Sequence, residues 1–171
     1  WSYGWDAENR LVWMEEHVNP TLAGSGLQRQ RLEFAYDTLG RRISKKVRTW
    51  NEGTSTWVFQ RRILMVWDGW NLLAELESAT EAGVAVVRRS YVWGLDLASS
   101  PTATGGVGAL LFAREHNTSG TLVATYAPCY DGNGNVMALM NVQTSAITAR
   151  YEYDVFGNLL RSTGPSATWN P

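Results

Sequence analysis

The amino-acid sequence predicts an all-β chain of antiparallel β-hairpins. Three observations support this prediction: many large aromatic residues, stretches in which apolar and polar residues alternate, and a turn motif that occurs five times. The 171 residues include nine Trp and seven Tyr; 44% are hydrophobic and 18% are charged. Aromatic side chains suit half-buried strands, where their rings cover neighbouring backbone and pack across strands. A chain of this composition can bury a core and is not disordered.

The repeated motif consists of an aromatic residue, Asp, two variable residues and then Gly or Asn. It occurs at residues 5–9, 36–40, 67–71, 130–134 and 153–157. An Asp that starts a turn can accept hydrogen bonds from backbone amides two residues on, and Gly or Asn tolerates a left-handed conformation at the last position. Such a turn commonly connects two strands of a hairpin. The predicted turn residues are Asp6, Asn9, Asp37, Gly40, Asp68, Asn71, Asp131, Gly134, Asp154 and Gly157.

The alternation of apolar and polar residues places the strands. Residues 31–48, 57–77 and 134–161 are expected to be antiparallel strands with turns at 37–40, 68–71 and 154–157. In the second segment the odd-numbered positions are apolar at Trp57, Phe59, Ile63, Met65 and Trp67, with Arg61 as the single exception. No segment of comparable length has a helical period, so the helix content should be low.

Residues 98–109 interrupt the strand pattern and are Gly-rich, which predicts a loop or an irregular crossing. The whole chain, 1–171, is interpreted as one repeat region. Because it opens within a patterned segment, we expect it to be a fragment of a larger array. Unpaired backbone groups are then expected at residues 1–5 and 159–162, where the chain could pair edge to edge with copies of itself or with flanking repeats.

The charge balance argues against two classes of partner. Fifteen basic and sixteen acidic residues give a net charge of -1, so no overall field attracts nucleic acid or anionic lipid. The basic pairs at 41–42, 45–46, 61–62 and 88–89 are expected on solvated strand faces, because alternation sends the two members of a pair to opposite faces. No apolar run approaches the roughly 20 residues that a membrane helix needs.

Three short segments resemble known binding or modification motifs. Residues 131–135 (DGNGN) begin like a calcium-binding EF-hand loop, but Val136 and Val142 replace the required Gly and Glu, so a turn is favoured. Residues 105–108 (GGVG) lack the Lys and helix of a phosphate loop. Residues 117–119 (NTS) match a glycosylation acceptor but are better explained as the turn of a hairpin between 110–114 and 121–126.

No constellation of nucleophile, base and orienting residue is evident, so we expect no enzyme activity, no cofactor and no metal. Cys129, the single cysteine, is expected to be a small buried apolar residue, and His17 and His116 have no partner at ligand spacing. Glu75 and Glu77 could share a strand face as an acid–base pair, but a solvent-facing role is favoured. Asp96 is expected to make structural hydrogen bonds.

The ordered set of motifs resembles bacterial rearrangement-hotspot (RHS) proteins with tyrosine–aspartate (YD) repeats. The matching segments are 91–97 (YVWGLDL), 105–111 (GGVGALL), 130–136 (YDGNGNV) and 151–159 (YEYDVFGNL), and the resemblance runs from about Gly4 to Pro165. It implies a ribbon of hairpins that spirals into a curved, hollow β-shell around a variable C-terminal toxin. In the family a core-associated segment with cleaving aspartates normally follows a sequence like residues 157–165. The chain stops at Pro171, so neither that segment nor a toxin is expected in it.

The resemblance therefore predicts a structural section of an RHS/YD-repeat shell in a secreted or cell-surface bacterial protein. Its partners would be flanking repeats and an encapsulated toxin domain. The alternative is a module that binds carbohydrate or a cell-surface partner through exposed Trp and Tyr side chains. A hydrolase is the least favoured of the three hypotheses.

Overall fold

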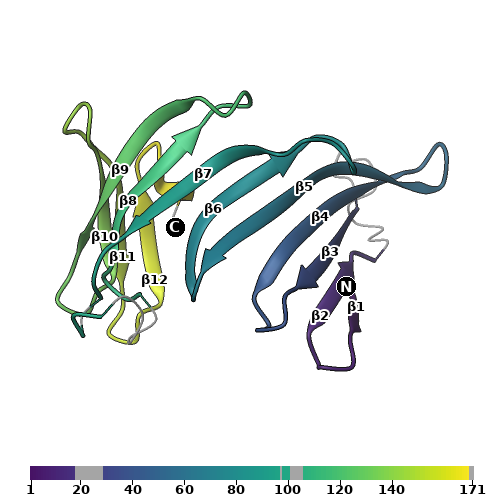
Figure 1. Ribbon diagram of the computed structural model, residues 1–171, viewed down its shortest axis with the longest axis horizontal. Helices are drawn as coiled ribbons and strands as arrows, with labels where there is room; N and C mark the ends of the chain where they lie inside the picture. Colours follow the sequence, from purple (N-terminus) through teal and green to yellow (C-terminus); the bar gives the residue numbers. More distant parts are fainter. Residues whose placement is uncertain (18–28, 97, 101–105, 170–171) are drawn as a thin grey trace. The chain divides into compact units, whose positions relative to one another are not determined.

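The computed structural model describes residues 1–17, 29–96, 98–100 and 106–169. In these residues the chain forms one antiparallel sheet of twelve strands, whose order in the sheet is their order in the sequence (Figure 1). The described part contains no α-helix, and a short 3-10 helix, η2 (Ala167–Trp169), follows the last strand. The predicted all-β class and low helix content are confirmed.

The strands are β1 (Ser2–Trp5), β2 (Leu11–Glu15), β3 (Gln30–Tyr36), β4 (Arg42–Asn51), β5 (Thr56–Asp68), β6 (Asn71–Ser78), β7 (Val86–Trp93), β8 (Leu110–His116), β9 (Leu122–Tyr130), β10 (Val136–Asn141), β11 (Ile147–Tyr153) and β12 (Leu159–Thr163). The segments predicted as strands, 31–48, 57–77 and 134–161, contain only strands and their turns. Of the predicted loop at 98–109, residues 101–105 lie outside the described residues. The remainder, 98–100 and 106–109, is free of strand.

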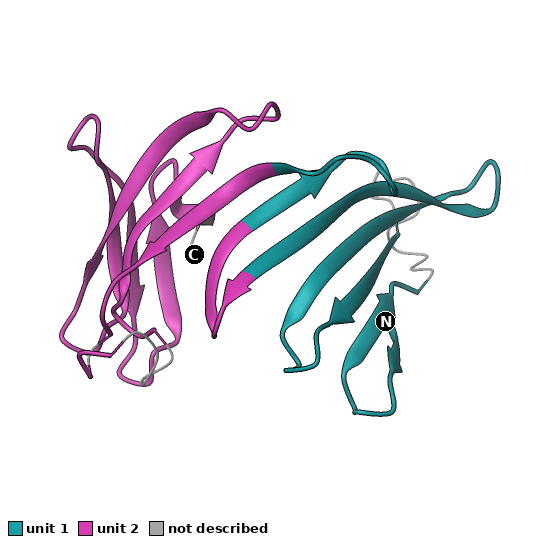
Figure 2. Cartoon of the chain, viewed as in Figure 1, with its two compact units in different colours: residues 1–66, 75–86 teal, residues 67–74, 87–171 magenta. Residues whose placement is uncertain are grey.

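The chain divides into two compact units (Figure 2). Unit 1 comprises residues 1–66 and 75–86, and unit 2 comprises residues 67–74 and 87–171. Unit 2 has a core in which Tyr91, Leu139 and Tyr151 are buried, together with small residues such as Ala113 and Ala149. In unit 1, Val47 is the buried hydrophobic residue among those described. Unit 1 therefore depends more on contacts along its strands than on a central core.

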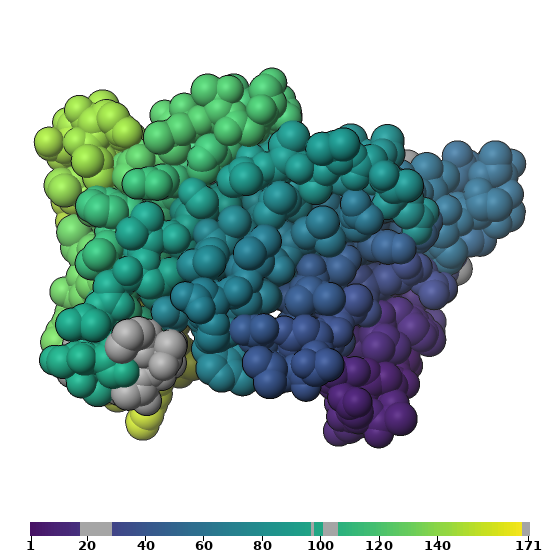
Figure 3. Space-filling view, viewed as in Figure 1, coloured from purple at the N-terminus to yellow at the C-terminus, as the bar shows by residue number. Residues whose placement is uncertain are grey.

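In the first hairpin, the ring of Trp13 on β2 lies directly over Gly4 on β1. The two residues are cross-strand partners, and a Cβ added to Gly4 would stand 1.9 Å from Nε1 of Trp13. A glycine within a strand marks such a close approach, because the aromatic ring fills the space that a side chain would take. Figure 3 shows this hairpin in purple, uncovered on the face in view.

A β-bulge in β5 corrects the predicted parity of that strand. Arg48 of β4 pairs with Phe59, whereas its neighbour Val47 pairs with Arg61, so Gln60 is an extra residue. The side-chain amide of Gln60 donates to the hydroxyl of Thr49 at 2.8 Å. A bulge shifts the alternation by one residue. Trp57 and Phe59 consequently lie on the opposite face of the sheet from Arg61, Ile63 and Met65, and not on a shared face as predicted.

Candidate functional site: repeated turns and aromatic clamps

Four of the five motif turns share one hydrogen-bond pattern, which is clearest at Asp154. Oδ1 of Asp154 accepts hydrogen bonds from the backbone amides of Phe156 and Asn158, each at 2.8 Å, and Oδ2 accepts one from Nδ2 of Asn158 at 2.7 Å. The backbone amide of Gly157 donates to the carbonyl of Asp154, and the amide of Asp154 donates to the carbonyl of Asn158. The φ of Gly157 is 83°. The Asp side chain thus organises the five residues of its own turn.

The same pattern recurs at Asp6, Asp37 and Asp131. The residue four positions after each Asp supplies the donor to Oδ2: Arg10, Arg41 and Asn135, at 2.8, 2.7 and 2.9 Å. The residue at the last motif position has a positive φ in every case: 59° at Asn9, 79° at Gly40 and 84° at Gly134. The positive φ predicted for Gly40 and Gly157 is confirmed.

These hydrogen bonds lower the pKa of the turn carboxyls. The pKa of Asp131 and of Asp154 is below its ordinary value, first because of the hydrogen bond from the Asn side chain and then because of the backbone amides. The backbone amide of Arg10 has the main part in lowering the pKa of Asp6. Burial alone would raise the pKa of Asp37, but hydrogen bonds from the side chain and backbone of Arg41 lower it. The four carboxylates are acceptors that hold their turns together.

The turn at residues 68–71 is different, and the role predicted for Asn71 is wrong. The positive φ, 54°, belongs to Gly69, whereas Asn71 is the buried first residue of β6. Residues 69 and 70 therefore form a two-residue hairpin turn with Gly at its first central position, the type that matches the twist of adjacent strands. The sequence Asp-Gly at this point carried the signal for the shorter turn.

Two further turns follow the pattern without the preceding aromatic residue. Oδ1 of Asp96 accepts the amides of Ala98 and Ser100, and Ser99 has a φ of 56°, so the structural hydrogen bonding expected of Asp96 is confirmed. Oδ1 of Asn117 accepts the amides of Ser119 and Thr121, in the hairpin turn predicted there. A short side chain with an oxygen acceptor at the first position is the shared signal.

The aromatic residue that ends a strand reaches back to the preceding hairpin. Oη of Tyr36 donates to the carbonyl of Leu11 at 2.8 Å, Oη of Tyr130 to that of Leu110 at 2.7 Å, and Oη of Tyr153 to that of Val136 at 3.0 Å. Nε1 of Trp93 makes the equivalent bond to the carbonyl of Leu72 at 2.7 Å. We call these four bonds aromatic clamps. Each clamp joins one hairpin to the hairpin before it.

The clamps of unit 2 are partly buried. Trp93, Tyr130 and Tyr153 pack against the core cluster, and burial raises the pKa of Tyr130 to about 12. Its hydroxyl therefore keeps the proton that it donates to Leu110 throughout the ordinary pH range.

A groove of about 340 Å³ lies between the turns at Asp131 and Asp154. Asn135, Tyr153 and Phe156 contribute to its lining, and Phe156 is 88% exposed. The two carboxylates already accept N–H donors of their own turns. In the described ranges, no three His, Cys, Asp or Glu side chains come together as a metal site.

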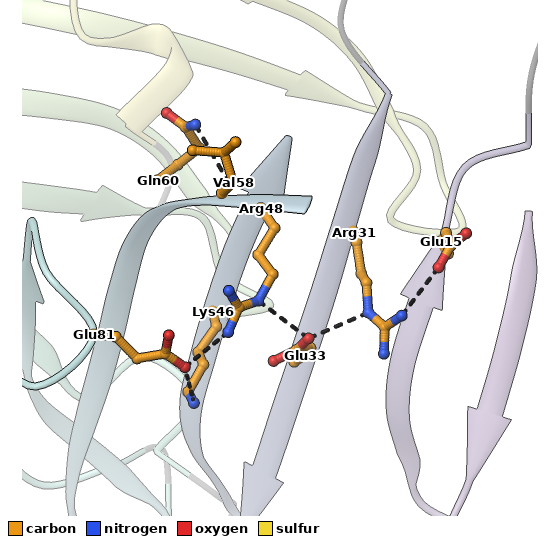
Figure 4. Close-up of polar contacts among 8 residues, drawn as sticks. All are labelled: Glu15, Arg31, Glu33, Lys46, Arg48, Val58, Gln60 and Glu81. Atoms are coloured by element: carbon orange, nitrogen blue, oxygen red, sulfur yellow. Dashed lines mark hydrogen bonds and ion pairs between the residues drawn. The ribbon is translucent and has the colours of Figure 1, made fainter. Parts of the chain in front are cut away.

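One face of unit 1 carries a network of ion pairs (Figure 4). Arg31 lies 3.1 Å from Glu15 and 3.2 Å from Glu33, and Glu33 lies 3.2 Å from Arg48. Glu81 then pairs with Arg48 at 2.7 Å and with Lys46 at 2.9 Å. The hydrogen bond from Lys46 is the main cause that lowers the pKa of Glu81. Three basic and three acidic side chains therefore balance within this network.

Arginine side chains stack on aromatic rings in the same unit. Arg29 lies over both Trp50 and Trp57, at 5.0 and 5.2 Å, and Arg31 lies over Trp13 at 5.2 Å. Such contacts stabilise the rings where they are and cover one surface of each. Lys45 departs from the expected solvated face, because it is partly buried and burial lowers its pKa.

Cys129 is exposed, contrary to the prediction, because alternation along β9 turns Tyr130 toward the core and Cys129 away from it. The carboxylate of Glu77 lies 3.6 Å from Arg61.

No helix in the described residues is long and apolar enough to cross a membrane.

Comparison with protein-family models gives no match, and comparison with curated proteins gives none either. Among solved structures, the chain is similar to a protein of unknown function from Bacteroides fragilis NCTC 9343. The two share 16% sequence identity with a TM-score of 0.40, over 95% of this chain and 88% of that one.

Proposed function

We propose that this chain is a structural section of an RHS-type YD-repeat shell, whose role is to surround a cargo polypeptide such as a C-terminal toxin. The observation that carries the proposal is the set of aromatic clamps. Each clamp bonds the end of one hairpin to the backbone of the hairpin before it, which extends a sheet hairpin by hairpin. A shell wall made of hairpins requires such a hydrogen bond, repeated in the same direction from each hairpin to the one before it.

The use of the motif residues supports a structural role over a catalytic one. The carboxylates of Asp6, Asp37, Asp131 and Asp154 accept hydrogen bonds within their own turns, and their pKa values are lowered. A general acid would need a raised pKa and access to a substrate. The motif is better explained as an architectural element.

Limited proteolysis of the full-length gene product tests the encapsulation. If the repeats enclose a cargo, mass spectrometry should find cargo peptides uncut at protease concentrations that cleave the same polypeptide after denaturation. If the cargo segment is cleaved as fast in the native polypeptide as in the denatured one, the proposal is contradicted. The proposal also expects a core-associated segment and a variable domain in the same gene product, and finding both would support it independently.

A second candidate function rests on three exposed aromatic residues at the start of the chain. Trp1, Tyr3 and Trp5 are 44%, 53% and 57% exposed; Tyr3 and Trp5 lie on one side of β1, and Trp1, just before the strand, has the same parity. Rings about 7 Å apart along a strand suit stacking on successive sugar units. A glycan array tests this candidate: binding that disappears in the variant Tyr3→Ala and survives in Leu160→Ala would favour a carbohydrate-binding module.

A further inference from the structure

The aromatic clamps obey a rule that identifies their acceptors. Within its own hairpin, each aromatic residue is the cross-strand partner of one residue: Trp5 of Leu11, Trp93 of Leu110, and Tyr130 of Val136. The carbonyl of that partner accepts the clamp from the next hairpin, in which the donors are Tyr36, Tyr130 and Tyr153 respectively. The residue that is the cross-strand partner of one motif aromatic residue thus accepts, at its backbone carbonyl, the hydrogen bond from the aromatic residue of the next hairpin.

The rule also predicts an acceptor at the end of the sheet. Tyr153 is the cross-strand partner of Leu159, the first residue of β12. Strand β12 is last in the strand order, and all five of its residues are exposed. In the described part of the chain no aromatic side chain donates to the Leu159 carbonyl. An acceptor for a further hairpin therefore stands at this edge.

A matching donor stands at the other end of the strand order. Trp5 has the position in β1 that Tyr36, Tyr130 and Tyr153 have in their strands, since it immediately precedes the Asp of a motif turn. Its indole is 57% exposed, and Nε1 makes no hydrogen bond to any residue that the structure describes. One edge offers the donor and the other edge offers the acceptor.

We propose that β12 of one copy of this chain pairs antiparallel with β1 of a second copy, with Nε1 of Trp5 donating to the carbonyl of Leu159. This pairing rests on the proposed function, because it identifies a second copy of the chain as the neighbour of the shell section. The joint continues the geometry of the existing joints between hairpins. Neither β1 nor β12 contains Lys or Pro, the residues that usually protect a sheet edge from pairing.

The existing joints also predict the register. Where β2 meets β3, the residue two positions after the acceptor, Trp13, pairs with the residue three positions before the donor, Glu33. Where β10 meets β11, the same offsets give Ala138 and Arg150, which are paired. Applied to acceptor Leu159 and donor Trp5, the offsets place Arg161 of one copy opposite Ser2 of the next.

Because the two edges are different surfaces, the contact is head to tail. Such a contact does not close on itself in a dimer unless the rotation between copies happens to form a ring. Analytical ultracentrifugation over a range of concentrations should therefore show a mass that rises with concentration. The variant Trp5→Phe keeps an aromatic ring and loses the N–H, and should weaken association about fivefold, the effect of one hydrogen bond. Trp5→Tyr supplies a hydroxyl like those of the observed clamps and should restore association at least in part.

A cysteine experiment tests the register directly. In a Cys129→Ser background, the variants Ser2→Cys and Arg161→Cys are mixed and oxidised. Directly opposed residues of an antiparallel pair have Cα atoms about 4.5–5.5 Å apart, within reach of a disulfide. The matched control replaces Arg161→Cys with Ser162→Cys, which moves the thiol to the opposite face of the sheet. We expect the mixed disulfide mainly in the first mixture.

Three results would overturn the proposal: a strictly monomeric chain at all concentrations, equal yields of mixed disulfide in the two mixtures, or disulfides between two Ser2→Cys copies as the main product. Circular dichroism of each variant checks that folding is retained. Failure here is distinguishable from failure of the shell proposal, since protection of cargo in the full-length product does not depend on pairing between separate copies.

Discussion

The hydroxyl of Tyr153 donates a hydrogen bond to the carbonyl oxygen of Val136 at 3.0 Å, and so joins hairpin β11–β12 to hairpin β9–β10. Tyr153 ends the strand before a motif turn, and Val136 begins the strand after the previous one. The aromatic residue of the motif is therefore a link between hairpins, while the Asp beside it shapes the turn.

Loss of this link should lower the free energy of unfolding. Tyr153→Phe removes the hydroxyl and keeps the ring, so we expect a loss of about 1 kcal/mol in urea unfolding followed by Trp fluorescence. Tyr3→Phe is the matched control, because the Tyr3 side chain is 53% exposed and makes no clamp. Equal stability of the two variants would show that the clamp contributes nothing.

Alkaline pH should weaken the fold through Tyr130. The folded-state pKa of Tyr130 is raised by burial to about 12, above the value of about 10 expected in the unfolded chain. A group whose folded pKa is raised contributes stability that is complete below the unfolded pKa and is lost as the pH rises through the folded pKa. The window is therefore pH 10 to 12.

The measurement is the free energy of unfolding between pH 9 and pH 12. Tyr130→Phe should flatten its slope, although not completely, because burial also raises the pKa of Tyr151. Tyr3→Phe should leave the slope nearly unchanged. An identical slope in the parent and in Tyr130→Phe would exclude Tyr130 as a source of the pH dependence.

Backbone strain should appear when the last motif position is filled by a β-branched residue. Gly157 has a φ of 83°, and a Cβ added there meets no atom within 4 Å, so any loss reflects the backbone alone. Gly157→Val should cost about 1–3 kcal/mol. Gly157→Asn should cost less, as Asn9 adopts a φ of 59° at the equivalent position. If both variants melt with the parent, the left-handed turn is not required for stability.

A substitution at Gly4 should displace the ring of Trp13. The Cβ of Gly4→Ala would overlap the indole, so the ring must leave its place under Arg31, at a cost of about 1–3 kcal/mol. Gly132→Ala is the control, because a Cβ at Gly132 meets no atom within 4 Å. Thermal unfolding of both variants makes the comparison, and equal melting temperatures would contradict the close approach of Trp13 and Gly4.

The sequence alone determined the strands and most of the turns, since both depend on residues close together in the chain. The hydrogen bonds around Asp154 span five residues, and the alternation that predicts β11 is a property of one strand. The left-handed position of Gly157 follows from the same short segment. Local chemistry was sufficient there.

Only the tertiary structure decided which strand atoms meet. The extra residue Gln60 exchanges the faces of β5, Asn71 lies buried in a strand instead of a turn, and Cys129 points outward. The acceptor of each aromatic clamp lies 17 to 25 residues away along the chain, as for Tyr153 to Val136 and Tyr36 to Leu11. Such contacts depend on the register between strands, which is set by pairing over the whole sheet. Because no short segment contains both partners of a clamp, the joint became visible only in the folded chain.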